Sequence, residues 1–239
     1  MRKYFPAGLF VLLVFLVSGC AEQSPDSPKS ETPKDVRTVD AGQILYTLPT
    51  ICEKLPPLEK TDQLPKDAIR MHEDYWRQIE IVPIAYRSQV EEQLKSFIAF
   101  RDAHKKGEGY TEIFLRKNVY PTLQNQWISL TNLGARSVAL ALGDQKVVGG
   151  FAIPDKSGAY LYGHTEPRGI VIYLGIAPPQ DGNLAPEFAS FVSNLASSQK
   201  LFMVDWYKAQ ILPDVTAETL KTWAGNYDPK SFRSSEARK

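Results

Sequence analysis

The amino terminus decides which part of this chain is left to fold as a domain. Arg2 and Lys3 precede an unbroken apolar run from Leu9 to Val17, and the small pair Ser18-Gly19 follows it. A charged start, a short apolar run and small residues before a cut site are the parts of a secretory signal peptide. A helix that spans a bilayer needs about 20 apolar residues, and this run is much shorter. We therefore expect residues 1–19 to be a signal peptide that is removed on export.

The residues at the expected cut site read Val17-Ser18-Gly19-Cys20. This stretch resembles the lipobox of bacterial lipoproteins, and the resemblance covers residues 1–20 only. It implies that Cys20 is the lipid attachment site, acylated on its sulfur and, after cleavage, usually on its new amino group as well. Several acyl chains, at about 0.8 kcal/mol per buried methylene, would hold a soluble domain on a membrane. The alternatives are an uncleaved membrane anchor and an ordinary signal peptide in which Cys20 is incidental.

Ala21, directly after the cysteine, bears on the destination of the protein. In Gram-negative lipoproteins an Asp at this position is the usual signal for retention in the inner membrane. The resemblance therefore implies a palmitate-type anchor in the cell outer membrane, with the protein facing the periplasm and the membrane as its first partner. The sequence itself does not establish the type of host.

Residues 20–40 combine serine, proline and charged residues with few apolar ones, so they cannot bury a core. We interpret them as the lipidated cysteine followed by a flexible tether, with an r.m.s. reach on the order of 25 Å. The remaining length favours a single globular domain at 41–228, because single cores of this size are common. Residues 229–239 are predicted to be a polar tail.

The charge of the mature chain excludes one class of partner. Loss of Arg2 and Lys3 reduces the 28 basic residues to 26, against 27 acidic ones, which gives a formal charge of −1. Because no basic stripe is present, we expect no nucleic-acid partner. A hydrophobic content of 43% is ample for a packed core.

Cys52 is the only thiol left in the mature chain once Cys20 carries lipid. An intramolecular disulfide is therefore excluded, and stability must come from the core. Apolar residues precede Cys52, and no basic residue in that stretch is placed to lower its pKa. We expect a small buried hydrophobe rather than a reactive thiol.

A helix is predicted from about Gln89 to Ala103, where Ser88 and Glu91 match a capping box. Its apolar residues recur at helical spacing and are Val90, Leu94, Phe97 and Ile98. A second amphipathic helix is predicted after Pro186, and a brief third one from Thr216 to Gly225. Short apolar and β-branched runs predict the strands Ile44–Leu48, Tyr75–Ile84, Ser137–Leu142, Lys146–Ile153, Ala159–Tyr162, Gly169–Ile176 and Leu201–Leu212.

The short connections in the middle of the chain require antiparallel neighbours. Helices among hairpins, without regular βαβ alternation, indicate an α+β domain with a mainly antiparallel sheet and two amphipathic helices. The stretch Tyr110–Leu133 fits neither the helical nor the strand period, so it is left unassigned.

Two groups of residues suggest metal or acid–base chemistry. His72-Glu73-Asp74 sets an imidazole beside two carboxylates, but adjacent residues diverge on a helix or a strand, so a solvated charged segment is favoured. His164 and Glu166 could share one side of a strand end, with Asp205 or Cys52 completing a site. The whole chain has three histidines. We therefore predict no metal centre and no cofactor.

The aromatic residues are predicted mainly to fill the core, with a recognition face as the alternative. By strand alternation Tyr160 and Tyr162 share one face, and one face of that strand is predicted to be wet. Gly149-Gly150 lies inside a strand pattern and predicts a bulge or a close backbone approach. The tryptophans among the aromatic residues that could fill the core or form a recognition face are Trp76, Trp127, Trp206 and Trp223.

These observations favour a non-enzymatic binding or interaction lipoprotein of the cell envelope, with an envelope protein or ligand as its partner. An immunity-type lipoprotein that neutralises a toxin is one version. The alternative is an envelope hydrolase, because catalytic residues can converge from distant positions. Its site would be drawn from Cys52, His72, His164, Glu166 and Asp205. The sequence leaves the enzyme question open, and Cys20 is the one site residue that it predicts.

Overall fold

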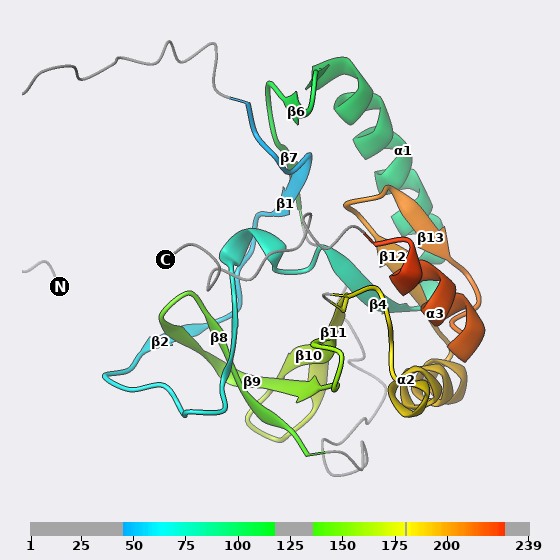
Figure 1. Ribbon diagram of the computed structural model, residues 1–239. Coiled ribbons are helices and arrows are strands. Elements are labelled where there is room, and N and C mark those ends of the chain that lie inside the picture. Colours follow the sequence, from blue (N-terminus) through cyan, green and yellow to red (C-terminus); the bar gives the residue numbers. More distant parts are fainter. Residues whose placement is uncertain (1–44, 118–135, 180, 228–239) are drawn as a thin grey trace, which may run out of the picture. The chain divides into compact units, whose positions relative to one another are not determined.

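The computed structural model describes residues 45–117, 136–179 and 181–227, which belong to one compact unit beginning at Asp40 (Figure 1). Cys20, the predicted signal peptide, the whole of the predicted tail and Trp127 lie outside these residues. None of the helices in the described ranges has the length and apolar character that a membrane crossing requires. These helices are α1 (Arg87–His104), α2 (Pro186–Gln199) and α3 (Ala217–Gly225).

A nine-stranded sheet organises the described residues. Its strand order is β13-β12-β4-β11-β10-β9-β8-β3, and β2 also pairs with β9. Every pairing is antiparallel except that of β3 with β8, so the predicted α+β class with a mainly antiparallel sheet is confirmed. The strands are β2 (Leu58–Lys60), β3 (Ile69–Met71), β4 (Ile79–Pro83), β8 (Val138–Leu142), β9 (Gln145–Pro154), β10 (Tyr160–Thr165), β11 (Val171–Ala177), β12 (Leu201–Asp205) and β13 (Gln210–Leu212).

Two smaller sheets complete the described strands. β1 (Thr50–Cys52) runs parallel to β7 (Phe114–Arg116), and β5 (Lys105–Lys106) forms a short hairpin with β6 (Gly109–Tyr110). The pairing of β1 with β7 places Cys52 directly opposite Arg116. Paired residues of neighbouring strands share one face, so these two side chains point the same way.

Side chains of the central strand β4 alternate between cores on opposite faces of the sheet. Ile79 and Ile81 join the cluster that contains the buried residues of α2 and α3. Val82 instead packs with the buried residues of α1. A third cluster, around Trp76, shares the α1 face over β8 to β11. Glu80 alternates with its neighbours onto this same face, between the second and third clusters.

The first predicted helix is confirmed, but its start differs. Val90, Leu94 and Phe97 are buried as the helical spacing predicts. The helix begins two residues earlier, after Tyr86, and no side chain caps it. The predicted capping box of Ser88 and Glu91 does not form, because Glu91 accepts a hydrogen bond from Arg87 Nε at 2.9 Å instead.

The stretch Leu201–Leu212 forms a hairpin, so the prediction of one long strand was wrong. The chain turns back between β12 and β13, with Ala209 at a φ of 54°. The Asp205 carboxylate accepts a hydrogen bond from the Lys208 backbone N–H at 2.9 Å, which closes the turn. No Gly, Pro or Asn marks this turn in the sequence, and for that reason the pattern concealed it.

Two early strand predictions also need correction. In the described part of Ile44–Leu48, only Tyr46 makes a bridge, to Tyr110, and the first strand is β1. The predicted strand Tyr75–Ile84 is shortened to β4 because Arg77 adopts a φ of 59°. The four strands predicted between Ser137 and Ile176, and the helices α2 and α3, form close to their predicted positions.

The prediction that aromatic residues mainly fill the core is confirmed for the described residues, but the prediction of a solvent-exposed face on β10 is wrong. Trp76, Trp206 and Trp223 are all buried. Tyr162 and Leu161 are both fully buried, so neither face of β10 is wet at this point. Gly149 has a φ of +66°, and a side chain there would collide with the Thr165 carbonyl, which confirms the predicted close backbone approach.

Candidate functional site

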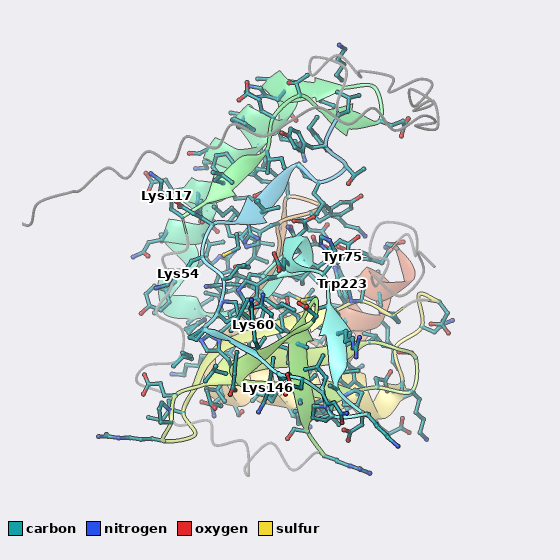
Figure 2. The ribbon with its side chains drawn as sticks, turned by 90° about the vertical axis from the view of Figure 1, so that its left-hand side faces the viewer. Lys54, Lys60, Tyr75, Lys117, Lys146 and Trp223 are labelled. Carbon is teal, nitrogen blue, oxygen red and sulfur yellow. The ribbon has the colours of Figure 1, made fainter. Side chains whose placement is uncertain are left out.

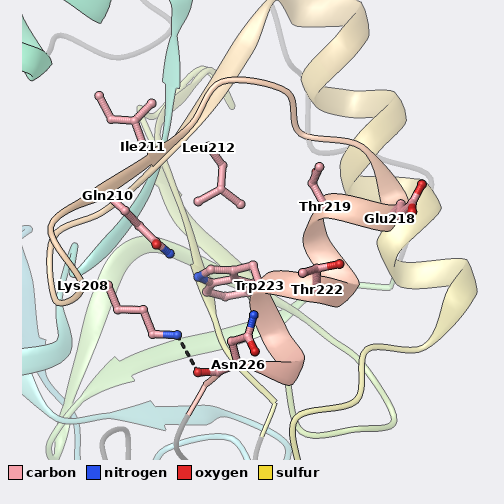
Figure 3. Close-up of a pocket in the computed structure, with 9 residues that line it drawn as sticks. All are labelled: Lys208, Gln210, Ile211, Leu212, Glu218, Thr219, Thr222, Trp223 and Asn226. Carbon is pink, nitrogen blue, oxygen red and sulfur yellow. Dashed lines mark hydrogen bonds between the residues drawn. The ribbon is translucent and has the colours of Figure 1, made fainter.

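An open groove of about 390 Å³ lies between β13 and α3 (Figure 3). Ile211, Leu212 and Trp223 give it apolar surface, and the other lining residues are polar or charged. Clefts that bind ligands commonly combine apolar surface with a few polar groups in this size range. The polar lining consists of Lys208, Gln210, Glu218, Thr219, Thr222 and Asn226.

β13, which lines one side of the groove, is the last strand in the sheet order. Within the described residues it pairs only with β12. Its outer edge therefore carries backbone N–H and C=O groups that have no sheet partner among these residues. An extended peptide can pair with such an edge and place alternate side chains in an adjoining groove.

Local sequence fixes α3 on the other side of the groove. The Thr216 hydroxyl accepts a hydrogen bond from the Thr219 N–H at 3.1 Å, and the Thr219 hydroxyl accepts one from the Thr216 N–H at 2.9 Å. This reciprocal cap satisfies two backbone donors at the start of the helix. It confirms the helix start predicted at Thr216 and presents Glu218, Thr219 and Thr222 to the groove.

Asp205 holds Trp223 in place from beneath the groove. Trp223 Nε1 donates to the second carboxylate oxygen of Asp205 at 2.9 Å, while the first oxygen closes the β12–β13 turn. One fully buried carboxylate thus positions both sides of the groove. Burial raises the pKa of Asp205, although these N–H donors oppose the shift.

Lys208 and Asn226 close one end of the groove. Lys208 Nζ donates to the Asn226 carbonyl at 2.7 Å, as the dashed line in Figure 3 shows, and lies 4.3 Å from the centre of the Tyr227 ring. Burial lowers the pKa of Lys208, and the nearby Asp205 opposes this shift. The ammonium group therefore links the hairpin to the end of α3.

We expect Asp205→Asn to destabilise the protein by about 1–3 kcal/mol, since an amide offers one acceptor to two N–H donors and leaves one of them unpaired. The raised pKa of Asp205 means that ionisation is less favourable in the folded state than in the unfolded state. Its contribution to stability therefore falls as pH rises above the ordinary carboxyl range, and the variant lacks this slope. Urea unfolding of both proteins across pH measures the effect. Equal stability at every pH would contradict this role of Asp205.

A second opening, of about 410 Å³, is lined by Asp67, Arg136, Val138, Ile153 and Pro154. Arg136 is the first residue of a described range, so this opening borders residues that the structure does not describe. The lysines labelled in Figure 2 are spread over the surface, and none of them lines either opening. The groove at β13 is therefore the better defined site.

A cluster of buried charges lies on the α1 face, away from the groove. Arg77 makes two hydrogen bonds to the Glu80 carboxylate, from Nε at 3.1 Å and from Nη2 at 2.9 Å. Arg116 Nη1 donates to the same carboxylate at 3.1 Å. The guanidinium carbon of Arg77 lies 4.5 Å from the centre of the Tyr173 ring, and that of Arg116 lies 5.0 Å from the Trp206 ring. We call these three charged residues the arginine–glutamate cluster.

Burial and the shared carboxylate shift the two arginines in opposite directions. Burial opposes the charged form of Arg77, but Glu80, Tyr173 and Cys52 together outweigh it, so the pKa of Arg77 is raised. For Arg116 burial is the stronger effect, and the pKa is lowered. Arginine keeps its proton in proteins, so both guanidinium groups remain charged. Sequence patterns did not predict this cluster, because Arg116 lies 36 residues from Glu80 along the chain and no local pattern relates the two.

The residues of the predicted hydrolase site are not brought together by any described contact. Cys52 is buried, as predicted, and burial raises the pKa of its thiol. His72 is exposed and pairs with Asp74 at 3.3 Å. Burial lowers the pKa of His164 to about 4. Asp205 points to the α3 face, on the other side of the sheet from Cys52.

Glu166, the remaining candidate, is exposed at the turn after β10. Within the described residues, no group of three or more His, Cys, Asp and Glu side chains is arranged to hold a metal ion. Sequence reasoning named Asp205 and Trp223, but not the groove that they support, because the turn before β13 was missed.

Comparison of the chain with protein-family models, with curated proteins and with solved structures finds no match in any of the three. A functional conclusion must therefore come from the residues and the geometry described above.

Proposed function

We propose that this protein is a lipid-anchored protein of the cell envelope whose domain binds an extended segment of a partner protein without catalysis. The observation that carries this proposal is the groove of about 390 Å³ alongside the outer edge of β13. A strand edge supplies backbone hydrogen bonds to any extended chain, while side-chain surface in the groove selects among chains. The lipobox-like sequence at Cys20 supports the anchor.

The lining of the groove favours a segment of mixed character. Trp223, Ile211 and Leu212 can pack against an apolar side chain, and Glu218 and Lys208 offer one charge of each sign. A volume of about 390 Å³ accommodates a few side chains, not a whole folded surface. An immunity-type function, in which the partner is a toxin, is one form of this proposal.

A photo-crosslinking amino acid at Thr222 tests the site directly. Thr222 is exposed and lines the groove, whereas its neighbour Lys221 is exposed and does not line it. In cells that make the full-length protein, we expect position 222 to capture an envelope protein through an extended segment, identified by mass spectrometry. Position 221 is the matched control.

Filling the groove provides the second half of this test. Thr222→Trp should weaken binding of the captured partner about ten-fold or more, because the added ring occupies the space of one side chain. Lys221→Trp should leave the affinity unchanged. Equal capture at both positions, or equal affinities for the two tryptophan variants, would show that the groove is not the binding site.

A further inference from the structure

The arginine–glutamate cluster carries more positive than negative charge. Two guanidinium groups face one carboxylate, and the side chains of Arg77, Glu80 and Arg116 are 6%, 2% and 3% exposed. The other titratable groups that influence the pKa of Arg116 are Cys52 and Tyr173. The Cys52 thiol donates to the Lys54 carbonyl at 3.2 Å and is neutral, since burial raises its pKa. One positive charge is therefore unbalanced among the described residues, and such burial is costly.

Two hydrogen-bond donors beside this charge also lack acceptors. Arg116 uses Nε for the Thr50 hydroxyl at 3.1 Å and Nη1 for Glu80, but its buried Nη2 has no partner among the described residues. Trp206 Nε1 is likewise buried and without a partner there. The guanidinium carbon of Arg116 lies 5.0 Å from the centre of the Trp206 ring, so the two donors belong to neighbouring groups in contact.

We propose that a small anion of the halide class binds between Nη2 of Arg116 and Nε1 of Trp206. Such an ion supplies the missing negative charge and accepts a hydrogen bond from both donors. A water molecule would accept hydrogen bonds from the two donors, but it would leave the positive charge unbalanced. Water is the better match for Gln78 Oε1, a buried acceptor that also lacks a partner among the described residues. Arg116 and Trp206 line neither opening described above, and the proposal is for a monoatomic ion, which needs the least space of any anion.

The proposal predicts that chloride stabilises the folded protein. In urea unfolding of the full protein in detergent, chloride replaces gluconate at constant ionic strength. Because a ligand that binds only the native state adds stability as its concentration passes Kd, the unfolding midpoint should rise with chloride. Identical midpoints in chloride and gluconate at all concentrations would overturn the proposal.

Trp206→Phe separates the anion site from general salt effects. The phenyl ring keeps an aromatic surface against Arg116 but removes one N–H donor, so about ten-fold more chloride should be needed for the same effect. Trp76→Phe is the matched control, because Trp76 is also buried but packs against Tyr173 and Tyr162 instead. An equal chloride response in the two variants would contradict the assignment.

Diffraction from crystals of the unmodified protein grown in bromide tests the proposal without any variant, so the result does not depend on whether a variant folds. The anomalous signal should place a bromide ion within about 3.5 Å of both nitrogen atoms. Bromide found only at other positions, an adventitious ion only, would overturn the proposal.

Discussion

Glu80→Gln should lower the free energy of unfolding by about 3–5 kcal/mol, because the change leaves two buried guanidinium groups without a carboxylate. Glu80 receives three hydrogen bonds from Arg77 and Arg116, and its side chain is 2% exposed. Removing one partner of a buried ion pair leaves an uncompensated charge, and that penalty exceeds the net value of the pair itself. Urea unfolding followed by tryptophan fluorescence measures the loss.

Glu91→Gln is the control for this prediction. Glu91 also pairs with an arginine, Arg87, at 2.9 Å, but both side chains are more than 40% exposed. Water screens an exposed pair, so its removal should change stability by less than about 1 kcal/mol. If the two variants differed by less than that amount, the arginine–glutamate cluster would not be an important source of stability.

Cys20→Ser should abolish lipid attachment and membrane retention completely, because a hydroxyl cannot replace the thiol that the lipoprotein pathway acylates. Cys20 lies outside the described residues, and the prediction depends on the lipobox-like sequence alone. The expected product is an uncleaved precursor or a protein released into the periplasm. Labelling with a palmitate analogue, followed by membrane fractionation, measures both properties.

Cys52→Ser is the natural control for the acylation experiment. Cys52 is the other cysteine of the chain, and it is buried in the core of the domain. This variant should keep the label and the membrane retention, although it places a hydroxyl group where the buried thiol of Cys52 packs. Equal labelling of Cys20→Ser and the unmodified protein would refute the lipid anchor.

Sequence patterns located most of the regular elements, since these depend on local periodicity. Val90, Leu94 and Phe97 predicted the buried face of α1, and Thr216 predicted the start of α3. The patterns failed where a side chain makes a contact that spacing does not reveal. Asp205 closes a turn without Gly or Pro, and Arg77 interrupts a run of strand-forming residues with a left-handed conformation.

The candidate site was harder to predict than the fold. The groove depends on the reversal between β12 and β13, which the apolar run through Leu201–Leu212 conceals. The arginine–glutamate cluster unites Arg116 on β7 with Glu80 on β4, and no local pattern relates residues so far apart. Single polar residues in apolar segments, such as Glu80 and Asp205, were the only signal, and both are fully packed in the structure.

The pairing of β4 has a consequence for how the chain reaches its native state. Glu80 in this strand is paired with Gly175 on one side and with Val204 on the other. Both partners are distant along the chain, and closing loops of this length costs entropy before any contact repays it. Proteins with such non-local contacts fold slowly. The central strand β4 therefore cannot form its native strand pairs until almost all of the domain has been synthesised.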